Sequence, residues 1–142
     1  MEKVGVELEY LGGLDFKVKF AHGAVDDLVI AGSRVSPEQM EGISRKLLAA
    51  SVAYCTTGWL FTLLKKTRVD VSALKSKAEV TMAKDDSGRD FVDEIGLEVQ
   101  VEVPEEDLIA FERCKAIVER GCLITRSLRK GIKVTASISR AK

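Results

Sequence analysis

Residues 47–64 form an uncharged, mostly apolar run of eighteen residues between the basic pairs Arg45-Lys46 and Lys65-Lys66. This is the lower edge of the length that a membrane-spanning helix needs. The run also contains Ser51, Gly58 and three threonines, and the segments around it are only half apolar. A helix that is apolar on nearly all sides must be covered on nearly all sides. We therefore expect a buried helix that is covered by sheets, and no membrane span.

Apolar and polar residues alternate on both sides of this run, a pattern typical of half-buried β-strands. Turns are expected at Gly12-Gly13 and at His22-Gly23, where glycine favours a change of direction. The expected strands are residues 4–10, 14–20, 28–30, 78–82, 95–103 and 134–138. Each of these strands has one apolar and one polar face, so each sheet is expected to cover the apolar helix on one side.

Helices are expected between the strands. The long one begins near Ser36-Pro37, because serine can cap a helix and proline fits its first position. We expect a break in it near Gly42 or Ser44. A second helix is expected at about 105–121, with acidic residues in its first turn. A short helical segment follows at 125–130 and stops at a glycine.

The resulting order β-β-β-α-β-β-α-β belongs to the α+β class. A chain of 142 residues is long enough for one core, so we predict a single domain over residues 1–142. Six strands with one polar face each can cover only part of the apolar helix. We therefore expect a homodimer in which two copies enclose each other's central helices.

The charge balance narrows the range of partners. The 22 basic and 22 acidic side chains cancel, which argues against nucleic acid and against an anionic membrane surface as partners. No secretory signal is visible at the start, so we expect a cytoplasmic protein. The three cysteines include no Cys-x-x-Cys pair. In the cytoplasm thiols stay reduced, and a disulfide there would be transient and functional.

Two of the three cysteines are candidates for chemistry. Cys114 shares a helical face with apolar residues and is expected to be a core residue. Cys55 interrupts the apolar run and Cys122 follows the second helix, so both stand at junctions in the pattern. A buried thiol needs a nearby cation or a helix N-terminus to become reactive. The candidate cations are Arg34, Arg45 and Arg126.

Other kinds of site find little support. His22 is the only histidine and lies in a turn-like context, so it is expected to be a solvated loop residue. One histidine without clustered acidic residues argues against a zinc site. Gly12-Gly13 joins two strands and is not a phosphate-binding loop. We expect neither a metal nor an organic cofactor.

Three segments resemble motifs of the OsmC/Ohr family, the osmotically inducible and organic hydroperoxide resistance proteins. Residues 42–55 resemble the family helix that ends in Ala-Ala-Cys. Residues 122–128 resemble its Cys-Pro-Val-Ser-Arg-Ser-Leu motif, and residues 69–74 resemble its strand entry, Gly-hydrophobic-Asp-Val-Ser-x-Leu. The resemblance covers nearly the whole chain and preserves the order of elements.

This resemblance implies two curved antiparallel sheets around central helices in an intertwined homodimer. It also implies an antioxidant thiol peroxidase of the stress response. By position, Cys55 would be the peroxidatic residue that attacks an organic hydroperoxide or H2O2 and becomes a sulfenic acid. Cys122 would then condense with it to a disulfide, which a dithiol reduces.

The sequence departs from the family pattern at the residues around the first thiol. Arg45 stands where active members have a glutamate that orients an arginine onto the thiolate. Leu14 occupies the arginine position of one branch, whereas Arg34 lies about where the other branch has its arginine. Leu123 replaces the proline after the second cysteine.

These departures leave two functions open. In the first, the chain is a peroxidase that uses Cys55 and Cys122, with Arg34 or Arg45 holding the thiolate. On a continuous helix Arg45 and Cys55 fall on different faces, so Arg45 would need the expected helix break to approach the sulfur. In the second, the same fold binds a small thiol or an apolar anionic ligand near Cys55 without peroxidase turnover.

Overall fold

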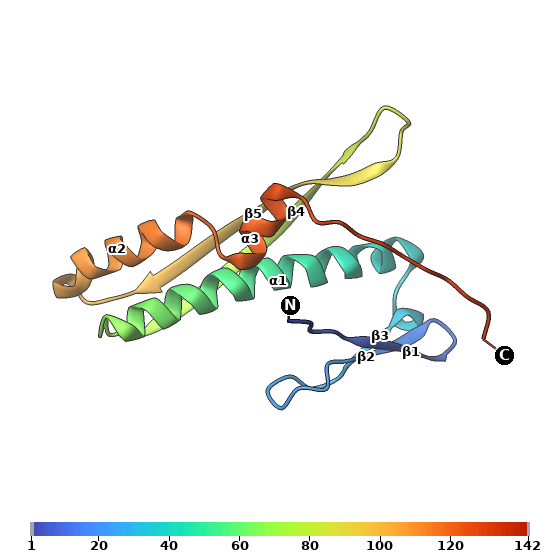
Figure 1. The fold of residues 1–142 in the computed structure, drawn as a ribbon, viewed down its shortest axis with the longest axis horizontal. Helices are drawn as coiled ribbons and strands as arrows, with labels where there is room; N and C mark the ends of the chain where they lie inside the picture. The colour runs from blue at the N-terminus through green and yellow to red at the C-terminus, as the bar shows by residue number, and fades with distance from the viewer. Residues whose placement is uncertain (1, 142) are drawn as a thin grey trace. The chain divides into compact units, whose positions relative to one another are not determined.

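The computed structural model describes residues 2–141, and Figure 1 shows their helices and strands. The chain divides into two compact units, one ending at Arg45 and one beginning at Lys46. The single domain expected from the chain length stays a prediction.

The first unit contains a three-stranded antiparallel sheet of β1 (Glu7–Gly12), β2 (Asp15–Lys19) and β3 (Leu28–Ala31), in that order. The three strands predicted for this part of the chain are therefore confirmed. The turn between β1 and β2 needs its glycines, because Gly12 and Gly13 have φ angles of 112° and 55°.

Helix α1 (Pro37–Lys66) begins with a capping box. The Ser36 hydroxyl accepts from the Gln39 N–H at 3.3 Å, and the Gln39 side chain accepts from the Ser36 N–H at 3.1 Å. The predicted start is confirmed, but the break near Gly42 or Ser44 is wrong, since α1 is continuous. A glycine costs only about 1 kcal/mol inside a helix. The cooperative hydrogen bonding of a long helix tolerates that cost.

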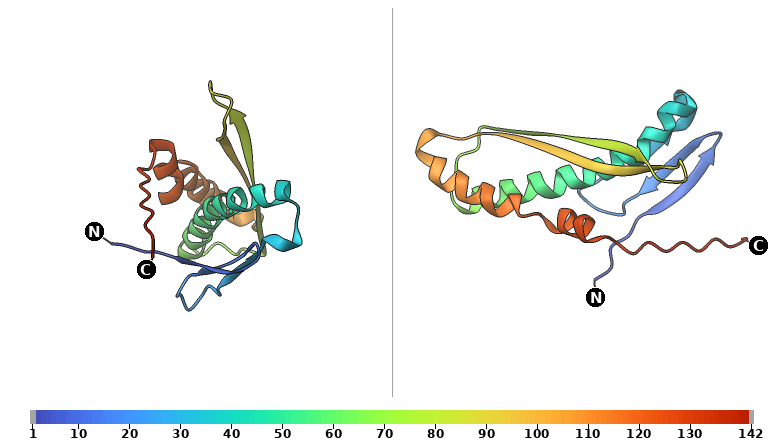
Figure 2. Two further views of the ribbon diagram at one scale, coloured as in Figure 1. Left: turned by 90° about the vertical axis from the view of Figure 1, so that its right-hand side faces the viewer. Right: turned by 90° about the horizontal axis from the view of Figure 1, so that it is seen from above.

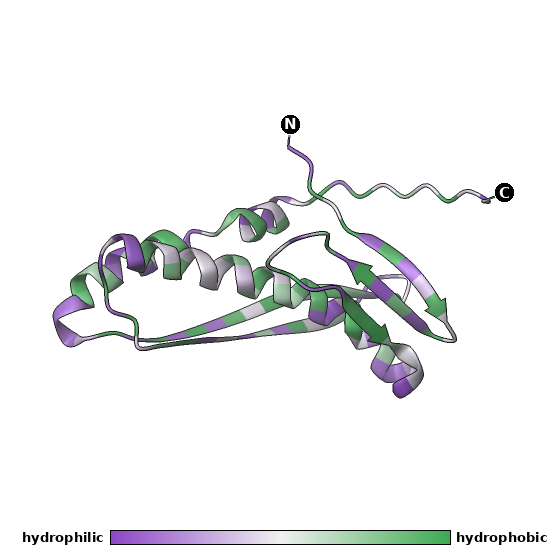
Figure 3. Cartoon of the chain, turned by 90° about the horizontal axis from the view of Figure 1, so that it is seen from below, coloured by the Kyte–Doolittle hydropathy of each residue, from purple (hydrophilic) through white to green (hydrophobic). Residues whose placement is uncertain are grey.

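The second unit contains the rest of α1 and a long antiparallel hairpin of β4 (Ala73–Lys84) and β5 (Asp90–Glu102). The hairpin lies lengthwise beside the second half of α1 (Figure 2). Apolar and polar residues alternate along both strands (Figure 3), and this alternation identified the hairpin in the sequence. Strand β4 is longer than the predicted 78–82, because β5 offers partners along its whole length.

Two helices follow the hairpin. A short 3₁₀ turn, η2 (Glu105–Asp107), leads into α2 (Leu108–Glu119), and α3 (Leu123–Lys130) comes after a tight turn. Both helices confirm the predicted elements in type and order. Helix α3 begins two residues earlier than expected.

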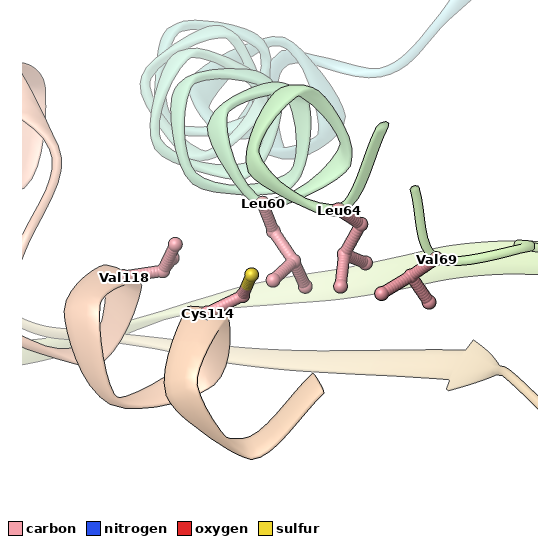
Figure 4. Packing of buried hydrophobic residues seen from close by; sticks show 5 residues of the cluster. All are labelled: Leu60, Leu64, Val69, Cys114 and Val118. Carbon is pink, nitrogen blue, oxygen red and sulfur yellow. The ribbon is translucent and has the colours of Figure 1, made fainter. Parts of the chain in front are cut away.

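The core of this unit lies where α1 and α2 face each other beside the hairpin (Figure 4). Leu60 and Leu64 of α1 pack with Val69 and with Cys114 and Val118 of α2. Leu64 has no exposed surface. Cys114 is therefore a core residue, as predicted.

The last predicted strand is wrong. Residues 131–141 form neither a helix nor a strand, and Val134 and Ile138 are 85 % and 96 % exposed. A strand needs a neighbour that satisfies its backbone hydrogen bonds. No strand within residues 2–141 pairs with this segment. The alternating pattern of residues 134–138 predicts a strand only if another strand pairs with it, so the pattern alone was not sufficient.

Within residues 2–141, α1 is the one helix that is long and apolar enough to cross a bilayer. A core helix of a globular protein meets the same criterion, so the finding is weak evidence for a membrane span. Leu60 and Leu64 belong to this apolar stretch and lie in the core. Only 22 % of the stretch is buried within the chain.

Leu64→Ala tests the importance of the contact between α1 and α2. We expect a loss of about 2–5 kcal/mol in the free energy of unfolding, because the substitution leaves a cavity at a fully buried position. Urea unfolding followed by circular dichroism measures it. Ile109→Ala on α2, where the side chain is 73 % exposed, is the control and should cost less than about 1 kcal/mol. Equal losses in the two variants would contradict this core.

A thiol pair at the start of helix α3

The turn between α2 and α3 places Cys122. Gly121 has a φ angle of 116°, a conformation that L residues rarely adopt. A Cβ atom at this position would lie 2.9 Å from Nη1 of Arg129. The same Nη1 donates to the carbonyl oxygen of Arg120 at 2.9 Å, at the end of α2. Glycine is thus required by the backbone conformation, and a Cβ atom here would also displace the guanidinium of Arg129.

Cys122 is the N-cap residue of α3, and its sulfur is surrounded by hydrogen-bonding groups. The Thr125 N–H donates to the sulfur at 3.4 Å, and the Thr125 hydroxyl lies 3.3 Å from it. The Thr56 hydroxyl of α1 lies 3.5 Å from the same sulfur. Cys122 is only 2 % exposed. These contacts connect α1 with the start of α3.

Cys55 lies near Cys122, the residue with which the family resemblance pairs it. The two thiols are close enough for each to shift the pKa of the other. The backbone N–H groups of Leu123 and Ile124, in the first turn of α3, act to lower the pKa of Cys55. All three cysteines are free thiols, and Cys114 lies apart in the core, 3.6 Å from the Thr67 hydroxyl.

The two thiols differ in their electrostatic environment. Burial raises the pKa of Cys55, the hydrogen bond to Cys122 raises it further, and the N–H groups of α3 oppose these effects. Burial also acts to raise the pKa of Cys122. This effect is outweighed by hydrogen bonds with Thr125, Thr56 and Cys55, which lower the pKa of Cys122 to about 6. The surroundings of the pair therefore favour a thiolate at Cys122 over one at Cys55.

A cleft of about 340 Å³ opens beside the pair. Its walls are mostly apolar and come from α1, β5 and α2; they include Val52, Leu97 and Phe111. Thr56 and Thr125 also line this cleft. The two hydroxyls that contact Cys122 are thus part of the surface that a molecule in the cleft would meet.

Arg34 and Arg45 lie in the first unit, whereas Arg126 belongs to α3 in the second. Arg45 donates from Nε to the Glu41 carbonyl oxygen at 3.1 Å. Arg34 ends the short 3₁₀ helix η1 (Gly32–Arg34). Hydrogen bonds from Ser33 lower the pKa of Asp15, and the charge of Arg34 adds to this effect. The continuous α1 removes the helix break that Arg45 would need. The roles of Arg34 and Arg45 at the thiol remain predictions.

The other polar candidates are not part of the thiol pair. His22 is exposed and accepts a hydrogen bond from the Ala24 N–H at 3.0 Å within its own turn, as expected of a loop histidine. Across the described residues, histidine, cysteine and carboxylate side chains form no group of three that could hold a metal ion.

Sequence reasoning missed Thr56 and Thr125. A signal for Thr125 was present, because it stands three residues after Cys122, the spacing at which an N-cap side chain meets the N3 residue. Thr56 directly follows Cys55 in sequence. Its contact with Cys122 depends on the packing of α3 against α1, which no local pattern reveals.

The model of the OsmC-like protein family matches residues 32–137, a stretch that includes both sulfurs of the pair. The chain belongs to the OsmC-like protein family. The resemblance found in the three sequence motifs is therefore confirmed. Comparison with curated proteins gives no match.

Solved structures support the same fold for this OsmC-like protein. An OsmC-like protein of unknown function from Vibrio cholerae has a TM-score of 0.64 at 14 % identity, over 89 % of this chain and 93 % of that one. A hypothetical protein from Aquifex aeolicus also has a TM-score of 0.64, at 20 % identity, over 92 % and 89 %. An OsmC-like hydroperoxide resistance protein from Jannaschia sp. has a TM-score of 0.52 at 13 % identity, over 95 % and 91 %. At these identities the likeness shows the fold alone.

The lowered pKa of Cys122 predicts a pH dependence of stability. Between about pH 6 and the ordinary thiol value of roughly 8.5, the unfolded chain binds a proton that the folded chain does not. The free energy of unfolding of the reduced protein should therefore rise across this window, and the gain should disappear as the pH falls through about 6. Urea unfolding at several pH values measures it.

Cys122→Ser is the control for this dependence. The unfolding free energy of this variant is subtracted from that of the unmodified protein at each pH. The difference cancels the contributions of the groups that titrate alike in both proteins. If the free energy of unfolding changed with pH in the same way in both proteins, Cys122 would not be ionised in the folded state near neutral pH.

Proposed function

We propose that this OsmC-like protein is a thiol-dependent peroxidase that uses Cys55 and Cys122. The adjacency of these two sulfurs at the start of α3, with one of them favoured as a thiolate, carries the proposal. Family membership supports it, as does the hydroperoxide resistance assigned to the similar protein from Jannaschia sp.. The proposed setting is the cytoplasm, where a stress response would need such an activity.

The proposed cycle has three steps. The Cys55 sulfur attacks one oxygen of the O–O bond of an organic hydroperoxide or H2O2. Cys55 becomes a sulfenic acid, and the other oxygen leaves as an alcohol or water after taking up a proton. The Cys122 sulfur then displaces the hydroxyl group from Cys55 and forms a disulfide. A dithiol reductant restores both thiols by exchange.

The first step needs a Cys55 thiolate, although burial raises the pKa of this group. A guanidinium close to the sulfur would stabilise the thiolate. We propose Arg34 for this role, because on the continuous α1 Arg45 falls on a different face from Cys55. Arg34 corresponds in position to the arginine of one family branch.

A binding function without turnover is the second candidate. The raised pKa of Cys55 favours it, because a neutral thiol is a poor nucleophile. In this case the apolar cleft would hold a small thiol or an apolar anionic ligand near Cys55. Arg45, in place of the family glutamate, would attract the negative charge of the ligand.

We also propose that the protein acts as a homodimer. Most of the apolar stretch of α1 remains uncovered within one chain, and Tyr54 near its middle is 81 % exposed. A second copy would cover this surface and remove it from water. Analytical ultracentrifugation distinguishes the dimer from a monomer.

Oxidation by cumene hydroperoxide tests the peroxidase proposal. The reduced protein should lose two of its three thiols, because the peroxide converts one pair into a disulfide. Thiol counting with a chromogenic disulfide reagent under denaturing conditions measures the loss. Cys55→Ser should abolish the formation of the intramolecular disulfide, whereas Cys114→Ser, which removes the core thiol, should leave it intact. Survival of all three thiols would refute the peroxidase and leave the binding function.

Arg34→Met and Arg45→Met test the activating cation. Loss of the cation should raise the pKa of Cys55 and slow its alkylation by iodoacetamide near pH 7, because the thiolate fraction falls roughly tenfold when a thiol pKa rises from 9 to 10. Rates are measured in a Cys122→Ser background, so that the neighbouring thiol does not contribute. If neither substitution changes the pH profile of alkylation, neither arginine has this role.

A further inference from the structure

Cys122 and Cys55 differ in their access to solvent and in their hydrogen bonds. Cys122 is almost fully buried, whereas Cys55 is partly exposed. Around Cys122, two hydroxyls and one N–H lie within 3.5 Å of the sulfur. A buried sulfur that lies near a second sulfur is well placed to react with that neighbour, and poorly placed to meet a dissolved substrate first.

The two hydroxyls come from different elements. Thr125 belongs to the first turn of α3, and Thr56 belongs to α1, one residue after Cys55. A hydroxyl can reverse its hydrogen bond and donate to the sulfur once the thiol has lost its proton. Hydrogen bonds that favour the charged form shift a titration toward that form. Both threonines can therefore hold a thiolate at Cys122.

The charged groups around this position do not supply the effect. Lys115 and Glu119 of α2 line the cleft together with Arg129 of α3, so the signs are mixed. Arg129 donates a hydrogen bond to the Arg120 carbonyl oxygen. A second hollow, on the side of the hairpin, is lined by Thr125 and by two acidic residues of β5, Asp93 and Glu94, among others. Acidic neighbours oppose a thiolate, and the groups that lower the pKa of Cys122 are its hydrogen-bond partners rather than charged side chains.

We propose that Thr56 and Thr125 hold Cys122 as a thiolate before any peroxide arrives, so that the second sulfur is already a nucleophile when Cys55 is oxidised. Thr56 and Thr125 are then positioning residues of the resolving step. The use of this thiolate in the resolving step rests on the proposed peroxidase function. The ionisation itself does not.

The step balances without a further reactant. The Cys122 thiolate donates its electron pair to the Cys55 sulfur of the sulfenic acid, and an S–S bond forms. The S–O bond of the sulfenic acid breaks, and the oxygen leaves as hydroxide, which takes up a proton from solvent. A thiolate that is present in advance keeps the sulfenic acid short-lived, and this protects Cys55 from further oxidation to sulfinic acid.

Thr56→Val removes one hydroxyl with little change in volume, and Thr57→Val is its matched control on the next residue of α1. The Thr57 hydroxyl bonds to Ser76 at 3.0 Å and does not contact the thiol pair. Thiolate absorbance at 240 nm, recorded against pH on the reduced protein without peroxide, should show one step near pH 6. Thr56→Val should move the midpoint of this step to a pH higher by roughly one to two, while Thr57→Val and Thr56→Ser should leave it in place.

Cys122→Ser identifies the sulfur that titrates. It should remove the step near pH 6, and a step that survives in this variant would overturn the proposal. A Thr56→Val profile equal to that of Thr57→Val would overturn the role of Thr56. Circular dichroism verifies that the variants are folded. If Thr56→Val does not fold, Cys122→Ser and Thr56→Ser decide whether Cys122 is held as a thiolate.

Peroxide then separates this inference from the proposed function. In Thr56→Val at pH 7, disulfide formation should slow by roughly the factor by which the thiolate fraction falls, and a dimedone adduct should accumulate at Cys55. The rate should recover at higher pH. If the step near pH 6 moves as expected but hydroperoxide oxidises no thiol, the peroxidase proposal fails while the threonine-held thiolate stands.

Discussion

The first turn of α3 is the structural element on which the thiol pair depends. Its free N–H groups are available because a helix leaves its first donors unpaired. The Thr125 N–H donates to the Cys122 sulfur, and the N–H groups of Leu123 and Ile124 act to lower the pKa of Cys55. One helix terminus therefore acts on two sulfurs, and the positive end of its dipole favours negative charge on either of them. In our proposal, the added hydroxyls of Thr125 and Thr56 favour the charge on Cys122.

The core and the turn at Gly121 fix this terminus in place. Leu60 and Leu64 of α1 pack against Cys114 and Val118 of α2, and this packing fixes the position of the two helices relative to each other. Gly121 then reverses the chain within one residue, and Arg129 ties α3 back to the carbonyl end of α2. The sulfurs come from positions 67 residues apart in sequence, and this packing brings them together.

Much of the fold could be predicted because its elements have strong local patterns. The alternation in β1, β2, β4 and β5, and the Ser36-Pro37 start of α1, identified elements that the structure contains. The break at Gly42 was wrong because local propensity is weak against the cooperativity of a long helix. The strand at 134–138 was wrong because a strand also needs a partner. The pairing of Cys55 with Cys122 came from the family motifs, whereas the contribution of Thr56 depends on tertiary contact and has no local signature.

The pairing of the two sulfurs is tested most directly by mapping the disulfide that forms after one equivalent of hydroperoxide. Trypsin separates the three cysteines into residues 47–65, 114–115 and 121–126. Mass spectrometry of the unreduced digest should show residues 47–65 joined to residues 121–126, at a yield that does not depend on protein concentration. A link to residues 114–115, or a cross-link that grows with protein concentration, would contradict a thiol pair at the start of α3.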